Sequence, residues 1–210
     1  MSFITGLLVW VSAFIIQVIT SLGYFGILLT MALESAALPI PSEIIMPFAG
    51  FIVFQGGFSF WLVVAVGTIG NLLGSLILYY VGLKGGRPLL LKYGRYALIS
   101  EKEVKRAESW FERHGTKMIF FSRMLPVART FISLPAGAAR MDLRKFALYT
   151  TLGSIPWNFA LTYIGFIFGE RWHEIEGFFK TLDIAVILGI AVIIVYLVVY
   201  LLARKTRKSR

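Results

Sequence analysis

The sequence predicts an all-α integral membrane protein, built as an inverted repeat in which transmembrane helices flank two opposed re-entrant helical hairpins. Its 210 residues are 58% hydrophobic, with a mean hydropathy of +0.78, which is too apolar for a soluble domain. All 21 Lys and Arg residues come after Leu83. Only Glu34 and Glu43 carry charge before that point, and both lie close to prolines that interrupt an apolar segment.

The first predicted element is an apolar helix in residues 1–21. Its apolar run from Phe3 to Ile19 indicates either a transmembrane span or a helix that lies on the lipid surface. The run lacks the basic segment that begins a cleavable signal peptide, so we expect the helix to be retained.

The first repeat is predicted to cover residues 22–83, with a re-entrant hairpin at 22–56 and a transmembrane helix at 59–83. Pro39 and Pro41 break the hairpin, because proline lacks a backbone donor and disfavours helix at the preceding residue. Each arm has roughly 11 to 15 residues, or about 16 to 22 Å, which reaches the middle of a bilayer without comfortably crossing it. Broken backbone at this depth is tolerated only where it is buried in protein or lines a polar cavity.

Basic residues indicate which side of the membrane each connection faces. Residues 84–114 are predicted to form a cytoplasmic loop, because Lys and Arg accumulate on the cytoplasmic side. Within this loop, residues 100–103 (SEKE) form a capping-box pattern that opens an amphipathic surface helix. Residues 182–203 predict a C-terminal transmembrane helix, and residues 204–210 a basic cytoplasmic tail. The chain is therefore expected to be a multi-pass protein of the cell membrane with a cytoplasmic C-terminus.

The second repeat is predicted at residues 115–169. Its re-entrant hairpin, at 115–140, contains Pro126 and Pro135, and basic residues at both ends indicate that it enters and leaves on the cytoplasmic side. A transmembrane helix at 146–169 follows it.

The two repeats are related by an offset of 87 residues, which aligns Pro39 with Pro126 and Asn71 with Asn158. An odd number of crossings between the copies makes the repeat inverted. Inverted repeats whose broken helices meet at the membrane midplane are typical of transporters.

Four charged residues lie beside the helix breaks: Glu34, Glu43, Arg123 and Arg129. A charge at the bilayer centre costs about 2.5 to 3.5 kcal/mol on insertion scales. The acids could instead reach outer water at the hairpin ends, and the arginines could snorkel from a shallow hairpin. Their positions beside the breaks, in matching parts of a repeat, favour a functional role.

The chemistry of these residues suits an anionic substrate. Arginine presents a planar fork that matches phosphate, and the half-helix after Pro126 adds unpaired backbone N–H groups. A low dielectric favours the protonated form of a carboxyl group, whereas a facing arginine favours the charged form. We therefore predict that Arg123 and Arg129 bind the substrate, and that Glu34 and Glu43 exchange protons as it enters and leaves.

A further set of residues is predicted to pack helices together. Small residues four apart allow spanning helices to approach closely, and asparagines can bond across such an interface. The set consists of Gly70, Gly74, Gly165, Gly169, Asn71 and Asn158.

Two segments resemble the signatures of the DedA family of membrane proteins. Residues 34–43 (ESAALPIPSE), followed by Gly50, are similar to the first signature, and residues 120–130 (FFSRMLPVART), followed by Pro135 and Gly137, are similar to the second. The resemblance runs from about Gly23 to Gly169. It implies the domain shared with eukaryotic lipid scramblases linked to autophagy, and a role in moving lipids between leaflets.

The resemblance also implies a substrate class. Bacterial members of the family include transporters that recycle undecaprenyl phosphate, the lipid carrier of cell-wall synthesis, and others linked to phosphatidylethanolamine. In the family, two acids of the first hairpin and two arginines of the second are functional, and they match Glu34, Glu43, Arg123 and Arg129. The second acid is an aspartate slightly further along in some relatives. Here the segment 44–83 contains no acid, so Glu43 has to take that role.

The expectation is therefore a flippase-like transporter of undecaprenyl phosphate that is coupled to the proton gradient, with phospholipid transport as an alternative. A proton-coupled carrier of ions or small solutes would use the same four charges, and a scaffold without a transported substrate also stays open. An enzyme is not expected, because residues 173–177 (HEIEG) lack the second histidine of a metalloprotease motif and no Gly-x-Ser-x-Gly motif is present. We expect no cofactor, no metal and no nucleic-acid partner. A homo-oligomer is compatible with the sequence.

Overall fold

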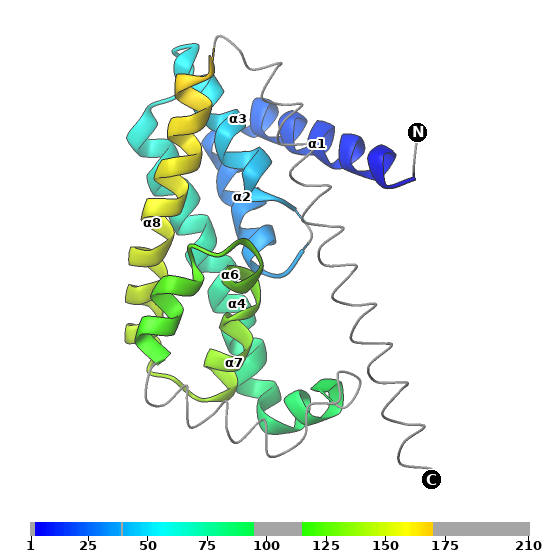
Figure 1. Ribbon diagram of the computed structural model, residues 1–210, viewed down its shortest axis with the longest axis vertical. Coiled ribbons are helices and arrows are strands. Elements are labelled where there is room, and N and C mark those ends of the chain that lie inside the picture. The colour runs from blue at the N-terminus through cyan, green and yellow to red at the C-terminus, as the bar shows by residue number, and fades with distance from the viewer. Residues whose placement is uncertain (1–2, 39, 95–114, 170–210) are drawn as a thin grey trace.

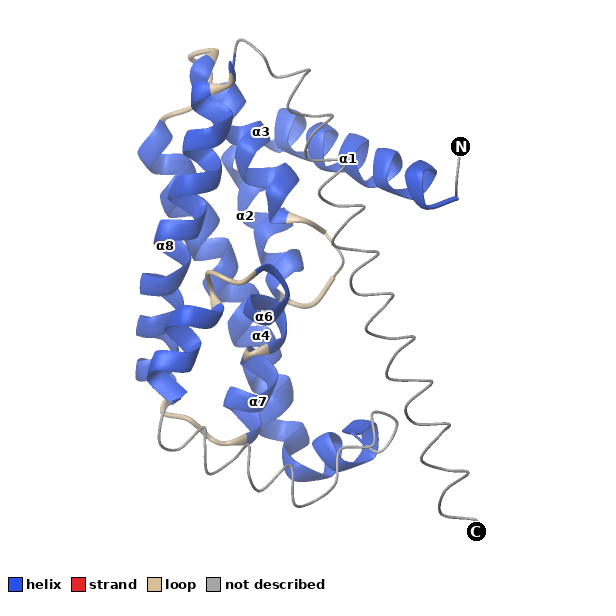
Figure 2. Cartoon of the chain, viewed as in Figure 1, coloured by secondary structure: helices blue, strands red, loops and turns tan. Residues whose placement is uncertain are grey.

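The computed structural model describes residues 3–38, 40–94 and 115–169, and within these ranges the chain is helical, without strands (Figures 1 and 2). Three predicted elements lie outside the described residues: the amphipathic helix after residue 100, the transmembrane helix at 182–203 and the tail at 204–210. Pro39 also lies outside them.

The first half of the described chain consists of α1 (Phe3–Leu22), α2 (Tyr24–Ser35) and α3 (Ser42–Phe54). Gly23 separates α1 from α2 with a φ of 60°, in the left-handed region that glycine adopts readily. Helix α1 therefore turns away and lies crosswise to the long upright helices (Figure 1). The residues between α2 and α3 form the break that the prolines predict, and Pro41 stands at the N-cap of α3 in extended conformation.

The helix that follows, α4 (Phe60–Gly94), is 35 residues long. The prediction that a loop begins at Lys84 was wrong, because α4 continues to Gly94. The leucines after Pro88 are strong helix formers, and a proline removes only one backbone donor from a helix. The part of α4 from Phe60 to Gly85 is, by length and composition, the one helix among the described residues that is long and apolar enough to cross a membrane.

The second half begins with a helical segment at 115–122. After a turn at 123–125, the chain returns through two short helices, α6 (Pro126–Phe131) and α7 (Ser133–Ala138). Pro126 opens α6 at its first turn, where its missing donor costs nothing. Pro135 lies within α7.

The last described helix is α8 (Leu143–Ile167). Asp142 caps it, because its side chain accepts a hydrogen bond from the backbone N–H of Lys145 at 2.9 Å. With 25 residues, α8 has the length of a span, but Ser, Thr, Asn and Pro make it less apolar than α4. A second transmembrane helix in this region stays a prediction.

The two hairpins approach the middle of the molecule from opposite ends of α4 and α8 (Figure 1). The α2–α3 pair comes from the end at which α1 lies, and the 115–138 segment comes from the other end. Their breaks meet near mid-height, where α2 contacts α6.

In each half, a short helix packs on the long helix of the other half. Helix α3 packs mainly on α8, and α7 packs on α4. The 87-residue offset aligns Gly50 with Gly137, and the two glycines occupy matching places. A Cβ on Gly50 would lie under 3.0 Å from the Thr162 carbonyl oxygen, and a Cβ on Gly137 would lie similarly close to the Tyr79 carbonyl oxygen. The inverted repeat itself stays a prediction.

Two apolar clusters form the interior, one centred on α2 and α3 and the other around Tyr79 and Phe146. Many large apolar side chains are nevertheless exposed on the outside of the bundle. They include Phe25, Trp61, Leu62, Ile77, Phe121, Phe131 and Leu148. An apolar outer surface of this extent fits a protein surrounded by lipid.

Candidate functional site

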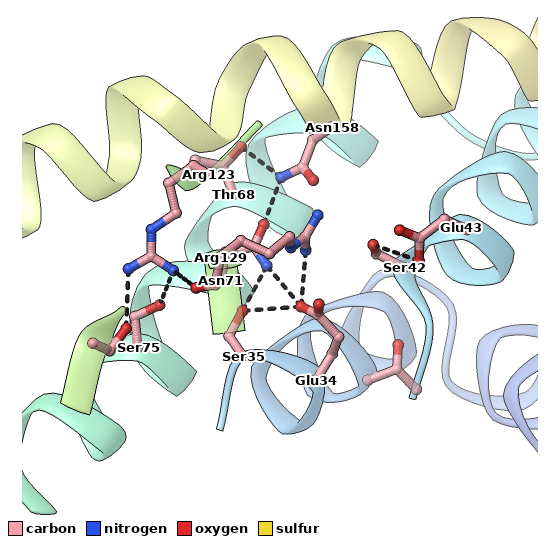
Figure 3. Close-up of polar contacts among 12 residues, drawn as sticks. Glu34, Ser35, Ser42, Glu43, Thr68, Asn71, Ser75, Arg123, Arg129 and Asn158 are labelled. Atoms are coloured by element: carbon pink, nitrogen blue, oxygen red, sulfur yellow. Dashed lines mark hydrogen bonds and ion pairs between the residues drawn. The ribbon is translucent and has the colours of Figure 1, made fainter. Parts of the chain in front are cut away.

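The centre of the site is a buried ion pair that joins the two hairpins. Arg129 Nη2, on α6, lies 2.8 Å from Glu34 Oε2, near the C-terminal end of α2 (Figure 3). Glu34 is 6% exposed and Arg129 is 4% exposed. Because the two residues are 95 positions apart in the chain, this pair depends on the meeting of the two breaks.

Glu34 accepts further hydrogen bonds at the same oxygen. Ser35 Oγ lies 3.1 Å from Oε2, and Asn71 Nδ2, on α4, donates to Oε2 at 3.3 Å. Asn71 also donates to Ser35 Oγ at 2.7 Å. The carboxylate is thus held by α6 and α4 together as well as by its own helix.

Arg123 belongs to the same buried cluster but has different partners (Figure 3). Its Nη1 donates to Ser75 Oγ at 2.9 Å and to the Arg129 carbonyl at 2.7 Å. Its Nη2 donates to Ser133 Oγ at 3.0 Å and to Thr150 Oγ1 at 3.1 Å. These four acceptors are neutral and come from α4, α6, α7 and α8, so one side chain ties together four helices.

The room for Arg123 is made by Gly153 on α8. A Cβ at Gly153 would lie 3.0 Å from both the Cβ and the Cγ of Arg123. The Phe146 ring lies against the other side of the guanidinium, with Arg123 Cζ 5.9 Å from the ring centroid, a distance at which a cation is attracted to an aromatic face.

Among the described residues, the cluster carries an excess of positive charge. Glu34 supplies one carboxylate, whereas Arg123 and Arg129 supply two guanidinium groups, and all three are buried. Buried charges are normally paired, and removing one partner of a buried pair costs about 3 to 5 kcal/mol. The uncompensated guanidinium makes the site electrostatically suited to one more anion.

A polar chain leads from Glu34 into the interface between α4 and α8. Asn158 Nδ2 donates to Asn71 Oδ1 at 2.9 Å and to Thr68 Oγ1 at 3.1 Å, so the two asparagines do bond across this interface. The four predicted packing glycines also lie at close contacts: a Cβ on any of them would come under 3.0 Å from a neighbouring atom. The nearest neighbours are Leu28 for Gly70, Ala32 for Gly74, Pro47 for Gly165 and Phe54 for Gly169.

Glu43 is the predicted site residue that the structure does not bring to the arginines. It lies in the first turn of α3, apart from the Glu34–Arg129 pair (Figure 3), and Ser42 Oγ is 3.3 Å from its Oε2. There, an acid interacts favourably with the helix dipole.

Three buried polar atoms near the site have no hydrogen-bond partner within the described residues: Arg123 Nε, Trp157 Nε1 and Asn158 Oδ1. The guanidinium of Arg129 also lies over the indole ring of Trp157, with Arg129 Cζ 5.8 Å from the ring centroid. Two of these atoms are donors, and leaving a buried donor unpaired costs about 1 to 3 kcal/mol.

The hydroxyl partners of Arg123, Glu34 and the two asparagines, and the indole of Trp157, were not predicted from the sequence. The missed residues are Ser35, Thr68, Ser75, Ser133, Thr150 and Trp157. A signal does exist on α8, where Thr150, Trp157 and Asn158 are spaced to share one face of the helix. Single hydroxyls in apolar helices are common, however, and which of them faces an arginine depends on helix packing.

Comparisons with known proteins give a consistent picture. The family described as the VTT domain matches residues 40–167. The chain is 37% identical to undecaprenyl phosphate transporter A of Bacillus subtilis, over 86% of this chain and 90% of the relative. It is 28% identical to undecaprenyl phosphate transporter A of Staphylococcus aureus, over 92% and 97% respectively. An alkaline phosphatase-like protein of Lactococcus lactis strain IL1403 is 37% identical over 88% and 89%. No solved structure matches the chain.

Proposed function

The chain belongs to the VTT/DedA family of integral membrane proteins, and from this premise we propose that it moves undecaprenyl phosphate between membrane leaflets, driven by the proton gradient. Two relatives named as transporters of this lipid support the substrate. The role is that of a transporter and not of an enzyme. It would return the lipid carrier for another round of cell-envelope synthesis.

The observation that carries the proposal is the buried Glu34–Arg129 pair together with the excess guanidinium. Among the described residues, the only hydrogen bond that the Arg129 side chain donates is the one from Nη2 to Glu34. Its remaining N–H groups are the natural donors for a phosphate. Arg123 already satisfies four acceptors and acts mainly by holding the hairpins in place. A lipid phosphate would neutralise the surplus charge, while its apolar tail stays in the bilayer.

Proton coupling follows from competition for Arg129. When Glu34 takes up a proton, its carboxyl group loses its charge and the ion pair weakens. A phosphate oxygen can then accept the hydrogen bond from Arg129 Nη2 that Glu34 Oε2 accepts now. When the phosphate leaves, Glu34 releases the proton and the pair reforms. Glu43 stays a second candidate for proton exchange, at a separate point.

We further propose that the two helical hairpins are re-entrant and open to opposite faces of the cell membrane, with the C-terminus in the cytoplasm. The opposed approach of the hairpins and the reciprocal packing of the halves support this arrangement. Alternating access would consist of exchanging the conformations of the two halves around the site.

Reconstitution into proteoliposomes tests the function. Vesicles that contain undecaprenyl phosphate in one leaflet should show protein-dependent exposure of the phosphate in the other leaflet, faster when a pH gradient is imposed. Parallel vesicles would follow phosphatidylethanolamine exposure and ion flux. Phosphatidylethanolamine exposure without undecaprenyl phosphate movement would favour the phospholipid alternative, and ion flux without lipid movement would favour a small-solute carrier.

A further inference from the structure

The indole of Trp157 is one of the features of the site that the contacts among the described residues leave unexplained. Trp157 lies on α8, next to Asn158, and on the helix face that also presents Thr150 to Arg123. Its ring faces the guanidinium of Arg129. The side chain is therefore in contact with the arginine that we propose to receive the phosphate.

The indole nitrogen needs an acceptor that the described part of the protein does not supply. Trp157 Nε1 is buried and has no hydrogen-bond partner there. An indole N–H can only donate, and a buried tryptophan usually finds a partner for this group. The described residues therefore leave this donor available to a hydrogen-bond acceptor that enters the site from outside.

The surroundings favour an anionic acceptor. The guanidinium of Arg129 lies against the same ring, and the arginines together exceed the carboxylate by one charge. A neutral acceptor would leave this charge uncompensated, whereas a phosphate oxygen would satisfy the indole N–H and the guanidinium at once.

We infer that Trp157 is a specificity-determining residue, which donates its Nε1–H to the phosphate of the lipid headgroup while its ring positions Arg129. This inference rests on the proposed function and adds a second kind of donor to it. Because the indole donor is uncharged, it favours phosphate without adding to the cost of burying charge.

The test uses the full-length protein in detergent micelles, with farnesyl monophosphate and farnesol as soluble probes that differ only in the phosphate. Trp157→Phe keeps an aromatic ring for Arg129 and removes the N–H. A hydrogen bond to a charged group is worth about 1.5 to 3 kcal/mol, so the variant should bind farnesyl phosphate at least about tenfold more weakly. Its affinity for farnesol should not change. Trp61→Phe, at an exposed tryptophan of α4, is the matched control and should bind both probes as the parent does.

A second measurement reports the indole directly in the parent protein. With 15N-labelled tryptophan, the Trp157 Nε1–H resonance, identified by its absence in Trp157→Phe, should shift when farnesyl phosphate is added but not with farnesol. Unchanged phosphate affinity in Trp157→Phe, an equal loss for both probes, or an unmoved indole resonance would each overturn the inference. A parent protein that does not prefer the phosphate over the alcohol would instead refute the proposed substrate.

Discussion

At the scale of single residues, Arg123 and Arg129 divide the work of the site. The Nη1 and Nη2 groups of Arg123 donate to four neutral acceptors on four helices, so its geometry is that of a structural tie. Arg129 has one ionic partner on the opposite hairpin and retains donors for a ligand. The two arginines therefore have different surroundings, which suit the two purposes proposed for them.

Lysine substitutions should separate these purposes. Arg129→Lys keeps the charge but loses the planar fork, so we expect lipid transport to fall by about tenfold or more, with little change in thermal stability. Arg123→Lys offers three donors to four acceptors and should lower the midpoint of thermal unfolding by several degrees. Transport assays and thermal unfolding on the same purified variants check both effects. Full transport by Arg129→Lys would argue against bidentate phosphate binding.

Glu34 should set the pH dependence of the protein. Phosphate binding requires Glu34 to release Arg129, so binding in the parent protein should weaken as the pH rises and Glu34 becomes charged. Glu34→Gln mimics the protonated acid and should lose the part of the pH dependence that Glu34 contributes, leaving only the part due to the second ionisation of the phosphate, whose pKa is about 6. Glu43→Gln is the comparison variant for this binding measurement, because it also loses a carboxyl group but Glu43 lies apart from the arginines. If Glu34→Gln and the parent protein have the same pH profile, Glu34 has no part in the coupling scheme.

At the scale of elements, the helix ends that shape the hairpins are tight and specific. After α2, the N–H groups of Ala37 and Leu38 bond back to the carbonyls of Glu34 and Leu33, and Ala37 has a φ of 72°. This is the Schellman pattern, which usually has glycine at that position. Arg140 repeats it after α7 with a φ of 53°: the N–H of Arg140 bonds to the carbonyl of Gly137, and the N–H of Met141 bonds to that of Ala136. A non-glycine residue in this conformation costs about 1 to 2 kcal/mol, so the chain holds these turns against local strain.

The proposed re-entrant arrangement makes a prediction about which side of the membrane each hairpin end faces. The chain contains no cysteine, so single cysteines can be introduced without a background. Ser21→Cys and Gln55→Cys, at the exposed ends of the first hairpin, should react with an impermeant maleimide from outside intact cells. Lys117→Cys and Arg140→Cys, at the ends of the second hairpin, should react only after permeabilisation. Labelling of Ser21→Cys and Gln55→Cys from opposite faces would mean that the first hairpin crosses the membrane.

At the scale of the whole molecule, the two halves are held together by close backbone contacts. Gly50 and Gly165 join α3 to α8, and Gly82 and Gly137 join α4 to α7, each with less than 3.0 Å available for a Cβ. The added atom would meet a backbone carbonyl, which cannot move aside as a flexible side chain does. The packing at one pair mirrors that at the other.

Adding a methyl group at these contacts should therefore loosen the whole structure. Gly50→Ala and Gly137→Ala should each destabilise the protein by about 1 to 3 kcal/mol, measured as a lower midpoint of thermal unfolding in detergent. Ala65→Val, at an exposed position of α4, adds apolar volume outside these contacts and serves as the control. If both glycine variants unfold like the parent protein, the reciprocal interfaces are not tightly packed.

The sequence alone determined the helical class, the positions of the breaks and the identity of the charged residues. Proline chemistry acts locally, and a charge in an apolar segment is visible without knowledge of the fold. The continuation of α4 beyond Leu83 was missed, because glycine and proline do not always end a helix when strong helix formers follow. Tertiary structure decided which acid meets which arginine, since Glu34 and Arg129 are brought together only by two breaks meeting between α4 and α8. It also separated Glu43 from the cluster, and it placed the hydroxyls and Trp157 around the guanidinium groups. Side-chain partners across an interface depend on how the helices pack. Sequence spacing does not encode this packing.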